Sequence, residues 1–102
     1  MRLKNGSGKL DFQAKDDLES IARFISKDSE KYAWLQIFQL RQRTKILNSQ
    51  IYSGKIVPEM EVENIRELIE GNYRIIYKIV NVQRVDILTV HHTSRNFKKR
   101  KI

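Results

Sequence analysis

The sequence lacks cysteine and contains only two histidines and one proline among its 102 residues. The absence of cysteine excludes disulfides and cysteine-ligated metal sites, and it suits a reducing compartment. His91 and His92 alone are too few ligands for a zinc site. No apolar run reaches the roughly 18 residues of a membrane span, and no secretory signal opens the chain. We therefore expect a cytoplasmic protein without a metal or an organic cofactor.

Carboxylates are also scarce relative to cations. Lys and Arg outnumber Asp and Glu by 20 to 12, which leaves a net charge of +8. A small basic protein attracts polyanions such as nucleic acid, a ribosome or an acidic protein partner. Much of the excess lies in the tail from Phe97 to Ile102, where Lys98, Lys99 and Arg100 are candidate nucleic-acid-binding residues. The alternative is that this tail is simply a solvated terminus.

The length suits one domain over residues 1–102. Residues 1–9 contain a turn-like, flexible Asn-Gly-Ser-Gly run, which is either a hairpin turn or a remnant of cloning. Residues 10–13 alternate between apolar and polar side chains, which predicts a short edge strand. From Lys15 onward the apolar residues Leu18, Ile21, Ala22 and Ile25 recur at the spacing of one helix face.

A break at residues 26–29 separates this helix from a second one, with Asp28 or Ser29 as its cap. The second apolar stripe runs from Ala33 to Ile51, over about five helical turns. Trp34 and Phe38 widen this stripe, so we expect them in the core; the alternative is an exposed, partner-binding patch. Two helices joined by a short break predict an antiparallel hairpin.

After a loop over residues 53–60 the apolar period changes from that of a helix to that of a strand. Residues 65–70, 73–80 and 85–92 alternate or are largely apolar, and turn-like residues separate them. They predict an antiparallel β-meander, with Tyr73 and Tyr77 packed against the helices. The fold class is therefore α+β: an N-terminal strand and a helical hairpin packed on the meander. The opposite face of the sheet is less covered, and a partner or substrate would bind there.

No standard catalytic motif is present, but polar residues gather at strand ends and loops. Metal-independent RNA cleavage needs a base for the 2′-hydroxyl, a cation for the phosphate and an acid for the leaving oxygen. Glu59, Arg74 and His92 are the candidates for these three roles, with Arg66 and Arg95 as further nucleic-acid contacts. Only one histidine of the His-His pair can share a sheet face with the strand arginine. The alternative is that the arginines form ordinary ion pairs with nearby carboxylates.

Five segments of the chain resemble, in order and spacing, the RelE/ParE-type toxins of bacterial type II toxin–antitoxin systems. The resemblance extends from about residue 10 to residue 96. It rests on Ala14-x-x-Asp17-Leu18-x-x-Ile21-x-x-Phe24-Ile25, Gly54-x-x-Val57-Pro58-Glu59, Ile65-Arg66-Glu67-Leu68, Tyr73-Arg74-Ile75-Ile76-Tyr77 and Ile87-Leu88-x-Val90-His91-His92-x-x-Arg95.

This resemblance implies a strand, a helical hairpin and a meander, as well as a co-expressed antitoxin that neutralises the toxin. The Val-Pro-Glu, Ile-Arg-Glu-Leu and Tyr-Arg-Ile-Ile-Tyr segments are more similar to the ParE-like members, which inhibit DNA gyrase. The alternative is a RelE- or YoeB-like endoribonuclease that cleaves mRNA on the ribosome, with Glu59, Arg74 and His92 as base, clamp and acid. A third hypothesis is a relative without an antitoxin that only binds nucleic acid through its basic tail.

Overall fold

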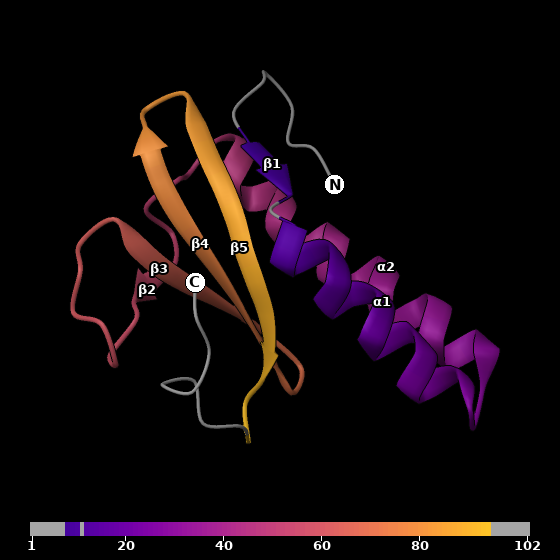
Figure 1. Cartoon of the computed structure of the whole chain (residues 1–102). Helices are drawn as coiled ribbons and strands as arrows, with labels where there is room; N and C mark the ends of the chain where they lie inside the picture. The colour runs from indigo at the N-terminus through magenta and orange to yellow at the C-terminus, as the bar shows by residue number, and fades with distance from the viewer. Residues whose placement is uncertain (1–7, 11, 95–102) are drawn as a thin grey trace.

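The computed structural model describes residues 8–10 and 12–94 (Figure 1). Five strands form one sheet in the order β1-β5-β4-β3-β2, and two helices precede four of them in the chain. The elements are β1 (Gly8–Leu10), α1 (Phe12–Ser26), α2 (Glu30–Thr44), a 3₁₀ helix (Lys45–Asn48), β2 (Lys55–Ile56), β3 (Ile65–Glu70), β4 (Tyr73–Asn81) and β5 (Arg84–His92). The predicted α+β fold is confirmed.

Strands β3, β4 and β5 form the predicted antiparallel meander. Their bounds differ from the predicted ones by no more than one residue, because short polar turns separate apolar-rich segments there. Gly71 in the turn between β3 and β4 has a φ of 58°, a conformation that glycine adopts without steric cost. In the next turn the side chain of Asn81 accepts a hydrogen bond of 2.8 Å from the Gln83 amide.

The N-terminal strand and the first helix both begin earlier than expected. The strand is Gly8–Leu10, which pairs in parallel with β5, so the strand expected over residues 10–13 was misplaced. Helix α1 begins at Phe12 instead of Lys15. Ala14 is fully buried and belongs to the same helix face as Leu18. The alternation of Leu10 and Phe12 with polar residues assigns residues 10–13 to a strand, which explains the late expected start of the helix.

The second helix is capped as expected but is shorter. The Ser29 hydroxyl accepts a hydrogen bond of 3.2 Å from the Tyr32 amide. The helix ends at Thr44, whose hydroxyl donates to the Arg41 carbonyl at 2.7 Å, and the chain then tightens into a 3₁₀ helix. Such a side-chain bond competes with regular helix bonding. The apolar stripe therefore continues past the end of the α-helix.

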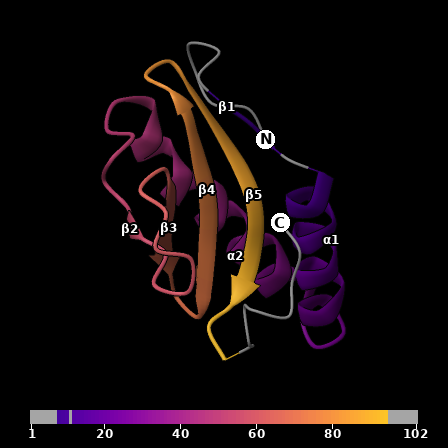
Figure 2. The ribbon, with the colours of Figure 1, turned by 60° about the vertical axis from the view of Figure 1, so that its left-hand side comes forward.

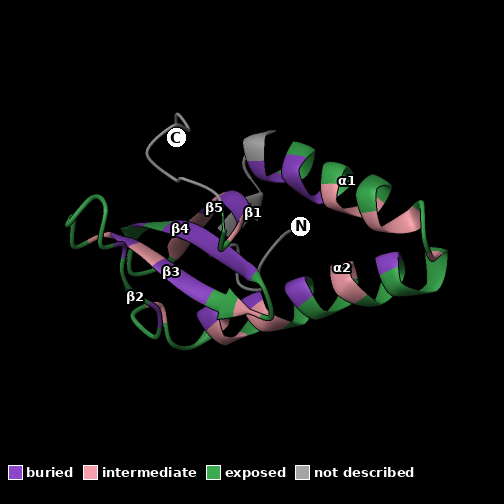
Figure 3. Cartoon of the chain, turned by 90° about the horizontal axis from the view of Figure 1, so that it is seen from below, coloured by how far each residue is buried: buried purple, intermediate pink, exposed green. Residues whose placement is uncertain are grey.

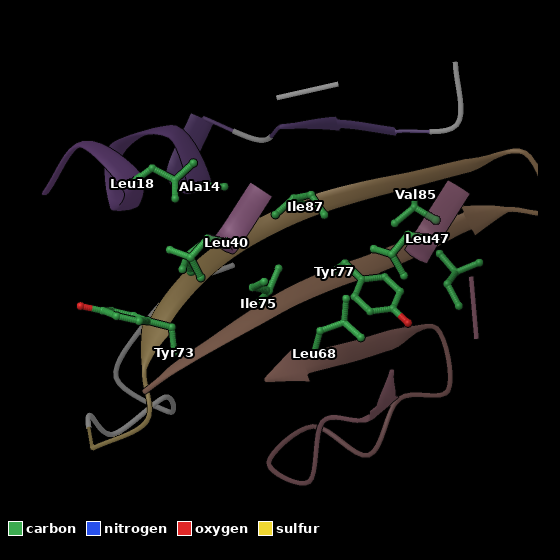
Figure 4. Packing of buried hydrophobic residues seen from close by; sticks show 12 residues of the cluster. Ala14, Leu18, Leu40, Leu47, Leu68, Tyr73, Ile75, Tyr77, Val85 and Ile87 are labelled. Atoms are coloured by element: carbon green, nitrogen blue, oxygen red, sulfur yellow. The ribbon is translucent and has the colours of Figure 1, made fainter. Parts of the chain in front are cut away.

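Both helices lie on one side of the sheet, and the main core fills the space between them and the sheet (Figures 2 and 4). Tyr73 and Tyr77 are buried there, as predicted. The prediction that Trp34 and Phe38 are core residues was wrong, because their side chains are 66% and 44% exposed. The core-facing side of α2 carries Ala33, Leu40 and Thr44, which belong to the predicted apolar stripe.

Candidate functional site

The sheet face opposite the helices carries a cluster of ionisable side chains. Arg74 on β4 lies directly opposite His91 on β5 and Ile69 on β3. Glu67, two residues before Ile69 on β3, projects from the same face. Glu59 reaches the cluster from the segment that joins β2 to β3. Residues from three strands and one loop thus meet around a single guanidinium.

Arg74 binds two carboxylates at once. Its terminal nitrogens donate to Glu59 Oε2 and Oε1 at 2.7 and 2.8 Å, which is a bidentate pair. Its Nε donates to Glu67 Oε2 at 2.7 Å, and a terminal nitrogen also contacts that oxygen. Lys55 Nζ lies 3.5 Å from Glu67 Oε1 at the edge of the cluster. Two carboxylates therefore face two cations, one buried and one exposed.

The burial of these groups increases toward the sheet. The side chains of Glu67, Arg74 and Glu59 are 3%, 11% and 25% exposed. The hydrogen bonds from Arg74 lower the pKa of Glu59 to about 2, although partial burial opposes this effect. The pairing with Glu59 in turn raises the pKa of Arg74. A carboxylate with so low a pKa is a weak general base near neutral pH, where an efficient base has a pKa close to 7.

Apolar packing presses the loop that carries Glu59 onto the sheet. Val57 is fully buried and packs with Ile65, Ile76 and Leu88 in a second, smaller core on this face. The Val57 amide donates to the Ile65 carbonyl at 3.2 Å, and the Val57 carbonyl accepts from the amides of Met60 and Glu61. The sheet face that we expected to be open is therefore partly covered by its own loop.

Tyr77 fixes the other end of this loop. Its buried hydroxyl donates to the Ile51 carbonyl at 2.8 Å and accepts from the Gly54 amide at 3.0 Å. Burial raises the pKa of the Tyr77 hydroxyl. A Cβ at Gly54 would lie 2.5 Å from the Glu67 carbonyl oxygen, so only glycine fits against this part of the sheet. These contacts set the direction in which residues 55–59 approach Arg74.

The structure brings Glu59 and Arg74 together but not His92. The His92 ring packs edge-on against Tyr73 at a centroid distance of 5.3 Å, and its Nδ1 is 2.7 Å from the Ser94 hydroxyl. His92 is paired in register with Tyr73, whereas His91 is paired with Arg74. His91 is 1% exposed. The histidine that shares the face of the Glu59–Arg74 pair is thus His91.

Arg66, a further candidate residue, makes its contacts outside this cluster. Arg66 donates to the carbonyls of Glu63 and Gly54, each at 3.0 Å, and its guanidinium lies 5.0 Å from the centroid of the Tyr52 ring. Arg66 therefore stabilises the backbone of the neighbouring loop through hydrogen bonds. It forms none of the ion pairs observed in the described part of the chain. Arg95, Lys98, Lys99 and Arg100 lie outside the described residues.

Comparison with known proteins identifies the family. The family model described as the ParE toxin of the type II toxin–antitoxin system parDE matches residues 9–97. The chain belongs to the ParE toxin family. No curated protein sequence matches this ParE-family chain closely enough to count as a relative.

Two solved structures share the fold of this ParE-family chain. A chain of the chromosomal ParDE system from P. aeruginosa aligns with a TM-score of 0.70 and 19% identity, covering 86% of this chain and 96% of that one. A chain of the RelBE2 toxin–antitoxin complex from Mycobacterium tuberculosis aligns with a TM-score of 0.55 and 20% identity, covering 84% and 95%. The family match makes the chain a type II toxin, and these two structures show the shared fold.

The ion-pair alternative named Glu67 or Glu70 as the partner of Arg66 and a helix carboxylate as the partner of Arg74, but in this ParE-family chain Arg74 pairs with Glu67 and Glu59. Glu67 alternates with Ile65 and Ile69, so the period of the strand placed it on an apolar face, where a glutamate needs a cation. Asp17 on α1 accepts a hydrogen bond of 2.8 Å from the Val90 amide and another from the Thr89 hydroxyl. It covers the edge of β5 beyond the point where β1 ends. No pattern within α1 indicated this contact.

The described residues can also be assessed for metal sites and for membrane-spanning helices. Among residues 8–10 and 12–94, no group of three His, Cys, Asp or Glu side chains is arranged to hold a metal ion. No helix within these same ranges is long and apolar enough to cross a bilayer.

Proposed function

We propose that this protein is a ParE-like toxin that inhibits DNA gyrase by binding, acts in the cytoplasm and is neutralised by a cognate antitoxin. The observation that carries the proposal is the state of Arg74. Its guanidinium is bound by two carboxylates, Glu59 and Glu67, in a largely buried network. An arginine bound to two carboxylates stabilises the local structure of a binding surface. It would have to break both ion pairs before it could bind a phosphate.

The family match over residues 9–97 supports the ParE-like assignment, since the matching model is that of the ParE toxin. Both solved neighbours come from toxin–antitoxin systems, and the net charge of +8 suits an acidic antitoxin. Excess positive charge also suits a target that is itself bound to nucleic acid. Arg95, Lys98, Lys99 and Arg100 remain our candidates for such polyanion contacts, whereas Arg66 is bound to loop carbonyls.

The alternative is a ribosome-dependent endoribonuclease, and one observation favours it. A carboxylate, a guanidinium and an imidazole, from Glu59, Arg74 and His91, share one sheet face. These are the group types that metal-independent RNA cleavage uses. In this alternative the acid is His91 and not His92, and substrate binding has to separate Glu59 from Arg74 so that the carboxylate regains a useful pKa.

Translation in a cell-free extract distinguishes the two functions. The purified chain is added at concentrations that stop growth in cells, and the mRNA is then mapped by primer extension. The proposed function predicts full-length translation and an uncut message. Cuts at fixed codon positions would overturn it in favour of the ribonuclease. Glu59→Gln should then abolish cutting, while Glu63→Gln, in the same loop but outside the cluster, should leave cutting unchanged.

A further inference from the structure

Helix α2 presents an apolar and basic stripe on the side that faces away from the core. Lys31, Trp34, Leu35, Phe38 and Arg41 follow one another at the spacing of a single helix face, and all five are exposed. We call these five residues the α2 outer patch. Figure 3 shows the helical hairpin projecting past the sheet, with the outer side of α2 exposed.

The aromatic residues of this patch form an ordered pair. The Trp34 and Phe38 rings stack with centroids 5.3 Å apart and an interplanar angle of 13°. Neither ring packs in the two buried clusters, whose members from α2 lie on its other side. Contiguous exposed apolar groups on a small protein mark an interaction surface, and tryptophan and arginine are enriched where binding energy concentrates.

The charge around the patch has one sign. Lys31 and Arg41 flank the three apolar side chains, and neither cation takes part in the ion pairs found among the described residues. No Asp or Glu occurs from Lys31 through Pro58. The two cations are separated by ten positions, which corresponds to about 15 Å along the helix axis.

We propose that the α2 outer patch binds an acidic amphipathic helix of the cognate antitoxin. This inference rests on the proposed function for the existence of that antitoxin. The partner helix would lay an apolar stripe of about three turns over Leu35 and the Trp34–Phe38 pair. Carboxylates near its two ends would face Lys31 and Arg41. A nucleic acid fits less well, because its bases could stack on the rings and its phosphates could meet the cations, but it has no apolar group to cover Leu35.

The test uses the full chain and the antitoxin encoded beside it, with any antitoxin tryptophan replaced by phenylalanine. Trp34 is the one tryptophan of the chain, so its fluorescence reports on the patch alone. Antitoxin binding should shift the Trp34 emission to shorter wavelength and shield it from acrylamide quenching. Calorimetry should show that Phe38→Ser and Arg41→Glu each weaken binding at least about tenfold.

Lys78→Glu is the matched control. It makes the same charge change as Arg41→Glu, at an exposed position of β4 on the sheet face opposite the helices. It should alter the affinity for the antitoxin less than about twofold. Circular dichroism should show that all three variants fold, since each substituted side chain is exposed.

Three results would count against the inference, and they are distinguishable. If Phe38→Ser and Arg41→Glu each bind the antitoxin as tightly as the wild type does, the docking site is refuted and the proposed function stands. A Trp34 response to a DNA or RNA oligonucleotide but not to the antitoxin assigns the patch to nucleic acid. The absence of any complex with the antitoxin refutes the proposed function, and the inference with it.

Discussion

Replacing Glu59 with Gln should change how the stability of the protein depends on pH. The pKa of Glu59 falls from 4.5 to about 2 in the folded chain, mainly because Arg74 donates two hydrogen bonds to it. A carboxylate whose pKa is lowered by folding stabilises the fold fully above its unfolded pKa. That stabilisation is lost as the pH falls from 4.5 through about 2.

The difference between 4.5 and about 2 sets the size of the effect. At about 1.4 kcal/mol for each pKa unit, the ceiling is about 3.5 kcal/mol. The Glu59 side chain is 25% exposed, so solvent screening reduces this value. We expect the ionised carboxylate to contribute about 1 to 2 kcal/mol near neutral pH.

The assay is urea unfolding followed by circular dichroism at several pH values between 7 and 2.5. The difference in the free energy of unfolding between wild type and Glu59→Gln should be largest near pH 6 and should shrink steadily below pH 4.5. Other carboxylates titrate in both proteins, so this difference isolates Glu59. Glu63→Gln is the control from the same loop and should follow the wild type. Parallel curves for wild type and Glu59→Gln across the whole range would refute the reasoning.

Three other substitutions test the contacts that position the site, each by urea unfolding. Tyr77→Phe should lower the free energy of unfolding by about 1 to 3 kcal/mol, because it leaves the Ile51 carbonyl and the Gly54 amide without their hydrogen-bond partner. An unchanged free energy of unfolding would mean that water replaces the hydroxyl. Gly54→Ala should destabilise by about 1 to 3 kcal/mol, since its Cβ would lie 2.5 Å from a β3 carbonyl oxygen; wild-type stability would show that the loop shifts freely. Asp17→Ala should cost about 2 kcal/mol through the lost bonds to β5, and the exposed neighbour Asp16→Ala much less; equal losses would contradict the role of Asp17 at the sheet edge.

The meander was predictable because period-2 alternation and short turns are local signals. Strands β3 to β5 are rich in apolar residues, and short polar turns separate them. The helix bounds were less predictable. Phe12 alternates with polar neighbours as a strand residue does, so the start of α1 was expected too late. The stripe that begins at Ala33 marked the core side of α2, but periodicity did not exclude the neighbouring apolar residues Trp34 and Phe38 from the core.

The candidate site was predictable in its residue types but not in its pairing. Glu59 and Arg74 could be chosen from the sequence, but the ion pair between them depends on how the loop folds over the sheet. The choice between His91 and His92 depends on the register of β5. A β-bulge interrupts that register between Ile76 and Tyr77 of the neighbouring strand, and periodicity alone does not reveal it.

We propose that this ParE-family chain acts on gyrase by binding. The most direct measurement is the supercoiling of relaxed plasmid DNA by purified gyrase, with increasing amounts of the chain and with or without its antitoxin. We predict that the chain blocks supercoiling, that the antitoxin restores it, and that Glu59→Gln retains the inhibition wherever it remains folded. Undiminished supercoiling at concentrations that stop growth in cells would contradict the claim.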